Sequence, residues 1–482
     1  MSYLELLKLA APEAILVVAA IIVLTVGLAR ANSDSICSIV AALGLIAAGV
    51  AVSMLPAANL FGGMLVVSPL TMTFQIVCLA LAFFTVLLAH GGSVPRHRAE
   101  YLALLLLATV GLMLLISSEE LLLIFIGLEL TGLSLYLMTA FDKTDARSAE
   151  AGLKYFLFGS TASAFTLFGL SLVYGMAGST TLSAIGEKLA EHSVQPLLAA
   201  GIVMTLVGLA FKVAAAPFHL WAPDAYEGGP ITSAAFIASA SKVASFVVLG
   251  KVVLIGFGPA QGSAGWQAMT AGWSPILAAL AALSIVVGNL VALAQTNVRR
   301  LLAYSAVAHA GYTLLGIISG AAGFAATLFY TSVYAFTLVG AFAVIARVRA
   351  ATSGDDISNF VGLRARSPLL AGCMAIFLLS LAGLPPLAGF FGKFYLFSAA
   401  LSAGDNHGLL WLVALALLGS LVSLYYYLVV LRAIFVDAAA AEASPVPAAS
   451  LQRIALTVLA AVVVLLGTLP ATFISRILAA LE

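Results

Sequence analysis

The chain has 482 residues, of which 63% are hydrophobic and 9% are charged, whereas roughly 25% of the residues of a soluble domain are charged. This composition excludes a water-soluble globular enzyme. The 21 lysines and arginines nearly balance the 20 aspartates and glutamates and leave a net charge of +1. The chain therefore has no general positive field with which to bind nucleic acid.

The three cysteines, Cys37, Cys78 and Cys373, are isolated thiols within apolar stretches, with no CxxC spacing. This pattern argues against a disulfide framework, a zinc site or an iron–sulfur cluster, so we expect no metal or redox centre in this chain. Met1–Pro12 lacks the basic start and small-residue cleavage site of a secretory signal, and we expect it to begin the mature protein.

About fourteen apolar stretches are long enough to cross a membrane, because a membrane-crossing helix needs ~20 apolar residues to span ~30 Å of hydrocarbon. They occupy most of the chain and leave no room for a separate soluble domain. The sequence therefore predicts an all-α polytopic membrane protein. The predicted spans are residues 12–30, 36–56, 70–90, 101–117, 119–141, 149–176, 196–222, 230–257, 272–294, 299–320, 323–349, 367–402, 407–436 and 451–475.

Basic residues are distributed unevenly among the predicted loops. Thirteen lie in loops that follow odd-numbered spans, and three lie at the termini or in the other loops. Because cytoplasmic loops carry the excess of lysine and arginine, we expect both termini to face away from the cytoplasm. The thirteen are Arg30, Arg96, Arg98, Lys143, Arg147, Arg299, Arg300, Arg347, Arg349, Arg364, Arg366, Arg432 and Arg453, and the three are Lys8, Lys188 and Arg476.

The sequence contains an internal repeat. Ala164–Gly169, AFTLFG, recurs as Ala335–Gly340, AFTLVG, 171 residues later, and Lys212 and Lys393 lie 181 residues apart. These offsets predict two copies of a five-helix unit, spans four to eight and nine to thirteen, which are inverted because an odd number of spans separates them. The predicted segments are an N-terminal three-helix segment at 1–95, a first repeat at 96–260, a second repeat at 268–437 and a C-terminal helix at 438–482.

Proline interrupts one span of each copy, the seventh and the twelfth. Lys212–Trp221, KVAAAPFHLW, and Gly383–Lys393, GLPPLAGFFGK, each place proline near a lysine. Because proline removes a backbone donor and clashes with the preceding turn, we expect two broken helices, as in transporters whose breaks border a buried polar path. The alternative is that both segments are loops between shorter helices.

Several ionisable residues fall within the spans, where they need a partner or water and are functional candidates by default. The helical rise places Glu129 ~16 Å and Lys242 ~18 Å into a ~30 Å core. Both are therefore near the midplane. Lys251, at ~32 Å, can snorkel to the far surface.

Other polar residues have a structural as well as a functional interpretation. Glu119 and Glu120 end the run SSEE, which is typical of a capping box at a helix start. Lys154 lies about one turn inside its span, which leaves open whether it is an anchor or a participant. His219 and His309 are either satisfied core histidines or proton relays, since imidazole titrates near neutral pH.

One carboxylate and three or four lysines at mid-membrane depth form a hydrophilic axis. No metal site has such a ligand set, and no nucleophile–base pair for hydrolysis is evident. A buried lysine takes up or releases a proton when a carboxylate approaches or withdraws. We therefore expect Glu129 to modulate Lys212, Lys242 to pass the proton along the membrane, and Lys393 to be the exit or terminal site.

Four runs of the sequence resemble the antiporter-like membrane subunits of respiratory complex I, the proton-translocating NADH:quinone oxidoreductase. They are Leu128–Tyr136, Phe211–Pro230, Arg299–Tyr312 and Leu384–Lys393. The resemblance implies fourteen helices, two inverted five-helix repeats and broken seventh and twelfth helices. It also implies proton-transfer roles for the residues that match the family's buried charges, Glu129, Lys154, Lys212, Lys242 and Lys393.

The resemblance further implies where cofactors and partners lie. NADH, FMN, iron–sulfur clusters and quinone belong to the complex, and this chain binds none of them. The implied partners are other membrane-arm subunits, with the antiporter-like subunit M and the small subunit K as neighbours, and lipids. Subunit M has glutamate in place of Lys393, and subunit L continues into a long lateral helix where this chain ends after span fourteen. Both differences favour a third type of antiporter-like subunit, in a bacterial inner membrane.

Two other functions stay open from the sequence. The same buried charges could serve a subunit of a multisubunit cation/proton antiporter, which sodium-dependent proton efflux would reveal. A structural spacer with a vestigial polar axis is the other alternative, and the retention of Glu129, three deep lysines and both breaks argues against it.

Overall fold

A computed structural model describes residues 7–30, 33–90, 97–191, 195–403, 408–438, 445–447 and 449–481. The chain divides into two compact units. Unit 1 comprises Met1–Val213, Gly228–Ser263 and Thr270–Ser274, and unit 2 comprises Ala214–Glu227, Ala264–Met269 and Pro275–Glu482. The four segments expected from the sequence stay a prediction.

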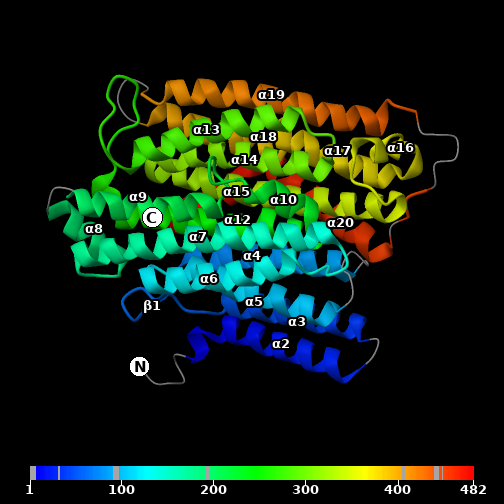
Figure 1. Cartoon of the computed structure of the whole chain (residues 1–482), viewed down its shortest axis with the longest axis horizontal. Coiled ribbons are helices and arrows are strands. Elements are labelled where there is room, and N and C mark those ends of the chain that lie inside the picture. Colours follow the sequence, from blue (N-terminus) through cyan, green and yellow to red (C-terminus); the bar gives the residue numbers. More distant parts are fainter. Residues whose placement is uncertain are drawn as a thin grey trace. The chain divides into compact units, whose positions relative to one another are not determined.

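Unit 1 consists of apolar helices and one short β-hairpin. Figure 1 shows α2, α3 and α5 side by side, and these three helices pack against one another. The hairpin strands β1 (Ala58–Leu60) and β2 (Leu65–Val67) are antiparallel. The helices are α2 (Ala11–Ala29), α3 (Asp34–Ser53), α4 (Pro69–Leu88), α5 (Arg98–Ser117), α6 (Leu121–Thr139), α7 (Ala146–Ala177), α8 (Leu182–Glu191), α9 (Pro196–Lys212), α11 (Ile231–Phe236) and α12 (Lys242–Lys251), with the π-helical turns η2 (Ile237–Ser241) and η3 (Val252–Gly256) and the 3-10 turn η4 (Gly258–Ala260).

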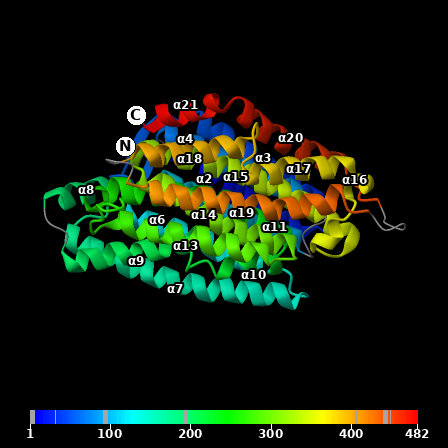
Figure 2. The same cartoon turned by 90° about the horizontal axis from the view of Figure 1, so that it is seen from above.

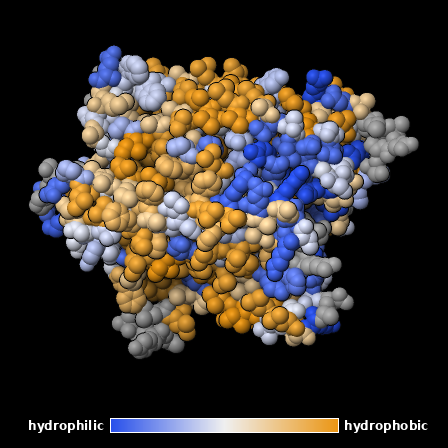
Figure 3. All heavy atoms as spheres, viewed as in Figure 1, coloured by the Kyte–Doolittle hydropathy of each residue, from blue (hydrophilic) through white to orange (hydrophobic). Residues whose placement is uncertain are grey.

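Unit 2 is also helical. Figure 2 shows α17 and α18 following one another along one line, and Figure 3 shows a mainly apolar surface over α19, where Leu417, Leu418 and Leu421 are exposed. Such a surface suits contact with lipid or with other membrane subunits. The helices are α10 (Trp221–Gly228), α13 (Trp273–Leu293), α14 (Val298–Ile318), α15 (Gly320–Thr352), α16 (Leu363–Arg366), α17 (Pro368–Ala382), α18 (Ala388–Ser402), α19 (Leu410–Phe435), α20 (Ser450–Thr468) and α21 (Pro470–Leu481), with the 3-10 turn η5 (Ile357–Phe360).

The number of membrane spans agrees with the sequence. Twelve helices of the described residues are long and apolar enough to cross a membrane. Two further spans are interrupted, because α9 ends at Lys212 before α10 begins at Trp221, and α17 ends at Ala382 before α18 begins at Ala388. Twelve and two make fourteen, which confirms the all-α polytopic fold with broken seventh and twelfth spans. Each break contains a cis peptide bond, Ala216–Pro217 or Pro385–Pro386.

Side-chain caps explain where several helices begin. The carboxylate of Asp145 accepts a hydrogen bond of 2.9 Å from the backbone N–H of Arg147 at the start of α7. The amide oxygen of Asn297 accepts bonds of 3.0 and 3.1 Å from the N–H groups of Arg299 and Arg300 at the start of α14. Each cap satisfies backbone donors that have no partner within the helix.

Small residues let α7 and α9 pack closely in unit 1. A Cβ atom on Gly169 would lie 2.6 Å from the backbone nitrogen of Thr205, and one on Gly201 would lie 3.1 Å from the carbonyl oxygen of Gly169. A Cβ atom on Gly208 would overlap the hydroxyl of Thr166. Close approach through small residues is a common way to pair helices in membranes, and here it fixes α9 beside the polar face of α7.

The elements outside the predicted spans include the β1–β2 hairpin, α8, η5 and α16, and the last predicted span is divided into α20 and α21. The predicted fourteenth span, residues 451–475, is too long at its C-terminal end. The span stops at Thr468, and Pro470 begins α21, since proline fits the first turn of a helix but not its interior.

Candidate functional site

A small cavity in unit 1 is lined by the predicted pair Glu129 and Lys212. Glu129 on α6 is half-buried, and its carboxylate accepts a hydrogen bond from the hydroxyl of Ser163 on α7. The cavity has a volume of about 20 Å³, and a water molecule needs about 10–15 Å³. One water can therefore occupy it. Its lining is Phe125, Leu128, Glu129, Tyr136, Ala162, Ser163, Thr166, Gly208, Phe211 and Lys212.

Lys212 reaches this cavity from the break in the seventh span. It is the last residue of α9 and is 7% exposed. Within the described ranges, no ion pair of 4.0 Å or less joins its ammonium to Glu129. The two groups share one cavity without closing on each other, so a water between them or a small movement is needed for proton exchange.

Lys242 is buried in unit 1, and its depth in the membrane stays a prediction. It is 5% exposed and is the first residue of α12, directly after the π-helical turn η2. A π-helical turn widens the helix and is frequent at functional sites. The sequence gives no signal for this turn, because Ile237–Ser241 has an ordinary helical composition.

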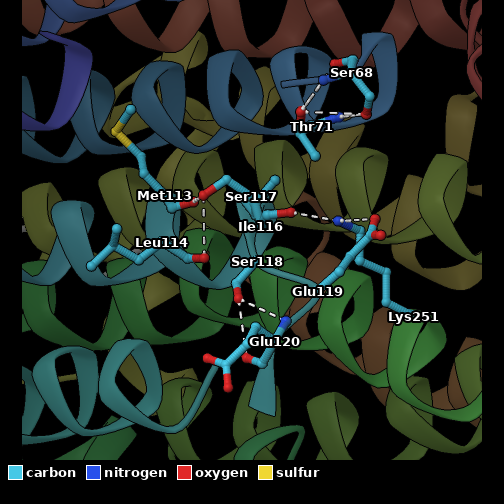
Figure 4. A network of polar contacts seen from close by, with 10 residues as sticks. All are labelled: Ser68, Thr71, Met113, Leu114, Ile116, Ser117, Ser118, Glu119, Glu120 and Lys251. Atoms are coloured by element: carbon cyan, nitrogen blue, oxygen red, sulfur yellow. Dashed lines mark hydrogen bonds and ion pairs between the residues drawn. The ribbon is translucent and has the colours of Figure 1, made fainter. Parts of the chain in front are cut away.

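Two interpretations of polar residues near the start of α6 are wrong. Lys251 does not snorkel, because it is 2% exposed and its ammonium lies 3.1 Å from the Glu119 carboxylate (Figure 4). Glu119 is therefore an ion-pair partner and no cap. Glu120 alone caps α6, by accepting bonds of 3.1 and 2.8 Å from the N–H groups of Leu122 and Leu123.

Lys154 lies apart from the lining of the Glu129 cavity. Its ammonium is 2.7 Å from the carboxylate of Glu150, one turn earlier on α7, and its side chain is 40% exposed. This geometry is that of a surface ion pair. The proton-transfer role that the family resemblance implies for Lys154 stays a prediction.

In unit 2, Lys393 is buried among neutral polar groups. It lies on α18, is 4% exposed, and donates hydrogen bonds of 3.1 Å to the carbonyl oxygen of Ala382 and 2.8 Å to the hydroxyl of Ser420. Its ammonium is 5.3 Å from the centre of the Tyr312 ring, a distance at which the ring face attracts a cation. Among the described residues no carboxylate lies within 4.0 Å of it.

His309 lies next to this site in a cluster of tyrosines. Its ring is 2% exposed and contacts the edge of the Tyr312 ring, at 5.6 Å between centres. One ring nitrogen is hydrogen-bonded to the hydroxyl of Tyr330 and the other lies 3.1 Å from the hydroxyl of Tyr427. The Tyr427 hydroxyl also lies 2.5 Å from that of Ser305. His309 thus joins two hydroxyl groups within the core of unit 2.

A second branch of the cluster passes through an amide. Asn289 donates a hydrogen bond of 2.9 Å to the hydroxyl of Tyr312 and accepts one of 3.2 Å from the hydroxyl of Tyr426. The sequence-based hypothesis assigned no role to Asn289 or to these tyrosines. The run Tyr304–Tyr312 could have indicated Tyr312, because its Ser305, His309 and Tyr312 lie three or four residues apart on one helix face. Asn289, Tyr330, Tyr426 and Tyr427 lie on other helices, and no local pattern links them to His309.

His219 lies in the break of the seventh span, in unit 2. It is 7% exposed, and its ring contacts Tyr304 edge-on at 6.2 Å between centres. Its Nδ1 is buried and has no hydrogen-bond partner among the residues that the structure describes. The predicted residues therefore form two groups. Unit 1 holds Glu129, Lys154, Lys212 and Lys242, and unit 2 holds His219, His309 and Lys393.

The chain matches a known family over most of its length. Residues 118–422 match the family described as NADH:quinone oxidoreductase/Mrp antiporter, TM. NADH-quinone oxidoreductase subunit N 2 of Acidobacterium capsulatum is 49% identical over 97% of this chain and 98% of its own. NADH-quinone oxidoreductase subunit N of Rhodospirillum rubrum is 37% identical over 98% of this chain and 96% of its own.

Solved structures share the fold. A chain of respiratory complex I from Thermus thermophilus with bound aureothin is 35% identical, covers 96% of this chain and 98% of its own, and has a TM-score of 0.81. A chain of the Mrp complex from Dietzia sp. covers 100% and 97% at a TM-score of 0.85, and its 20% identity shows the fold alone. The chain thus belongs to the NADH:quinone oxidoreductase/Mrp antiporter family, as a multi-pass antiporter-like membrane subunit similar to subunit N of respiratory complex I.

Proposed function

We propose that this chain translocates protons within an NADH:quinone oxidoreductase, through its buried glutamate and lysines, in response to quinone reduction elsewhere in the complex. The observation that carries the proposal is Lys393, a buried amine whose hydrogen-bond partners, Ala382 and Ser420, are neutral. A charged amine in such surroundings is unfavourable, and an approaching charge changes its affinity for a proton. Lys393 is therefore suited to loading and release.

The cavity of unit 1 supports the same proposal. Glu129 and Lys212 line one space that can hold a water, and a water can carry a proton between two groups that do not touch. Lys242 is the next buried amine of the unit. We infer that Glu129 sets the proton affinity of Lys212 and that Lys242 receives the proton.

The hydroxyl cluster of unit 2 supports the last step. Tyr312 lies against both Lys393 and His309, and His309 is hydrogen-bonded to Tyr330 and Tyr427. Hydroxyl and imidazole groups both donate and accept protons. We infer that this cluster moves protons to or from Lys393, which is the terminal site. We infer that His219, whose Nδ1 has no partner among the described residues, is a branch of the same path.

The proposal includes a place in the cell and in a complex. The excess of basic residues in alternate loops supports a bacterial inner membrane with both termini on the periplasmic side. Antiporter-like subunit M and the small subunit K are the proposed neighbours, with lipids around the remaining surface. NADH, FMN, iron–sulfur clusters and quinone are proposed to bind other subunits, so this chain contributes translocation and no redox centre.

The experiment compares Lys393→Ala with Lys188→Ala in inverted membrane vesicles that contain the assembled complex. Lys188 is a matched control because it is an exposed lysine paired with Glu191. NADH oxidation and proton uptake are measured together. We expect Lys393→Ala to lower the number of protons moved per electron, and Lys188→Ala to leave it unchanged. A normal ratio in Lys393→Ala refutes the proposal.

A cation/proton antiporter subunit is the second candidate, favoured by the shared fold of the Mrp complex chain. The two functions differ in what the chain purifies with. Co-purification with flavin and iron–sulfur subunits supports the quinone oxidoreductase. Sodium-dependent proton efflux in vesicles without those subunits supports the antiporter.

A further inference from the structure

Lys251 makes a buried ion pair that the proposed proton path does not use. It is the last residue of α12, the helix that begins with Lys242. Its ammonium lies 3.1 Å from the Glu119 carboxylate and donates a hydrogen bond of 3.0 Å to the carbonyl oxygen of Ile116 (Figure 4). The Lys251 side chain is 2% exposed and that of Glu119 is 26% exposed. The pair therefore joins the end of α12 to the turn between α5 and α6, largely shielded from water.

The backbone of Glu119 is hydrogen-bonded to two other segments of unit 1. Its backbone N–H donates a bond of 2.7 Å to the carbonyl oxygen of Gly63, at the tip of the β1–β2 hairpin. Its carbonyl oxygen accepts a bond of 2.9 Å from the N–H of Leu182, at the start of α8. Thr181, next to Leu182, donates from its hydroxyl to the carbonyl oxygen of Gly62 at 2.9 Å. The hairpin, the α5–α6 turn and the start of α8 thus form one anchor for the carboxylate.

The helix that carries both lysines has a π-helical turn at each end. η2 directly precedes Lys242, and η3 directly follows Lys251. The two lysines are nine positions apart, or about 13 Å along the helix axis. Wide turns are places where a helix changes register or direction. A contact at one end of the segment between two such turns therefore limits how that segment can be oriented.

We propose that Glu119 and Lys251 are positioning residues for Lys242, because their ion pair fixes α12 against the α5–α6 turn and so sets where Lys242 is presented. This inference rests on the proposed function, since it concerns the site of Lys242. An ion pair is suited to fixing the end of α12, because a charge-assisted hydrogen bond is stronger than one between neutral groups. Breaking the pair frees the end of α12 without touching Lys242 itself.

The decisive variant is the neutral pair Glu119→Gln/Lys251→Met in the full complex. It leaves no unpaired buried charge, and replacing a buried ion pair by neutral side chains of similar size often preserves or increases stability. We therefore expect the complex to assemble. The matched control is Glu120→Gln, because this neighbouring carboxylate caps α6 and contacts no lysine among the described residues. The charge swap Glu119→Lys/Lys251→Glu tests for rescue.

Two measurements are made on the assembled complexes. The first is the number of protons moved per electron, with NADH oxidation as reference. The second is hydrogen–deuterium exchange of residues 237–256. We expect the neutral pair to lose proton translocation relative to electron transfer and to exchange faster across this segment, the control to match wild type in both, and the swap to recover part of both.

The inference is overturned if the neutral pair pumps at the wild-type ratio, or if its exchange across residues 237–256 equals that of Glu120→Gln. Failure of the neutral pair to assemble also overturns it, because the role is then structural. Lys393→Ala is measured alongside. If Lys393→Ala loses pumping while the neutral pair keeps it, the proposed function stands and only the positioning role falls. If Lys393→Ala pumps normally, the proposed function falls, and the exchange data still decide whether the pair fixes α12.

Discussion

Replacing Gly208 by alanine is expected to separate α9 from α7 and to disturb the cavity of Glu129 and Lys212. The new Cβ atom would overlap the hydroxyl of Thr166, and it would lie 2.9 Å from the Thr166 Cβ and 3.2 Å from the carbonyl oxygen of Ala162. Carbon atoms pack best at about 3.5–4.0 Å, so one helix has to move or Thr166 has to change rotamer. Overpacking of this kind destabilises by about 1–3 kcal/mol.

The assay is the thermal stability of the detergent-purified complex, followed by native gel electrophoresis, together with the number of protons moved per electron. A cost of one or two kcal/mol changes a folded-to-unfolded ratio by a factor of about 5–30, which is a clear shift in such a measurement. Gly175→Ala is the matched control, because Gly175 lies on α7 and has no atom within 4 Å of its Cβ position. We expect that control to resemble wild type.

The double variant Gly208→Ala/Thr166→Ala tests the stated cause. Thr166→Ala removes the hydroxyl that the new Cβ would overlap and leaves only the contact of 2.9 Å with the Cβ of residue 166, so the two changes should be non-additive. The reasoning is refuted if Gly208→Ala is as stable as Gly175→Ala. It is also refuted if the double variant is no more stable than Gly208→Ala.

Two further predictions concern unit 2. Asp355→Asn removes the buried carboxylate that pairs with Arg299, whose side chain is 1% exposed. Breaking a buried pair costs about 3–5 kcal/mol, so we expect little assembled complex on native gels, and wild-type amounts would contradict this. Tyr427→Phe removes a hydroxyl that lies 3.1 Å from His309, so we expect fewer protons per electron at an unchanged rate of NADH oxidation. Tyr425→Phe, at a position that is 64% exposed, is the control, and equal ratios in the two variants would exclude a role for the hydroxyl.

The fold could be predicted from the sequence because hydrocarbon imposes length and apolarity on every span. Most predicted boundaries fall within a few residues of the helix ends, as for α4 (69–88 against 70–90) and α13 (273–293 against 272–294). The elements that the sequence did not predict lie at the ends of the spans, where water and tertiary contacts determine the backbone conformation. The β1–β2 hairpin, for example, is positioned by the backbone hydrogen bond from Glu119 to Gly63. No local sequence pattern predicts this bond.

Only the charged residues of the site could be predicted from the sequence, and their hydrogen-bond partners could not. Burial of Glu129, Lys212, Lys242 and Lys393 follows from their place in long apolar runs. The partners of these groups come from helices far away in the sequence, as Ser420 does for Lys393 and Ser163 for Glu129. Depth along a helix also says nothing about which neighbour a side chain meets. The depth of Lys251 therefore predicts a surface position, although its ammonium is buried against Glu119 at the α5–α6 turn.

The lysines of the two broken helices lie on opposite sides of the breaks, but both amines lie near the C-terminal end of the first half-helix. Lys212 is the last residue of α9, before its break, whereas Lys393 lies on α18, after its break, which explains why their spacing of 181 residues differs from the repeat offset of 171. Lys393 reaches back to the carbonyl oxygen of Ala382, the last residue of α17.

Both amines are thus associated with the C-terminal end of the first half-helix, where unpaired carbonyl groups and the helix dipole favour a cation. Gly383 permits this in the twelfth span, because it has a positive φ of 85° and a Cβ atom there would lie 3.0 Å from the Lys393 side chain. A break that exposes carbonyl groups can stabilise a transient ammonium without a permanent counter-ion. This is what a site that must both load and release a proton requires.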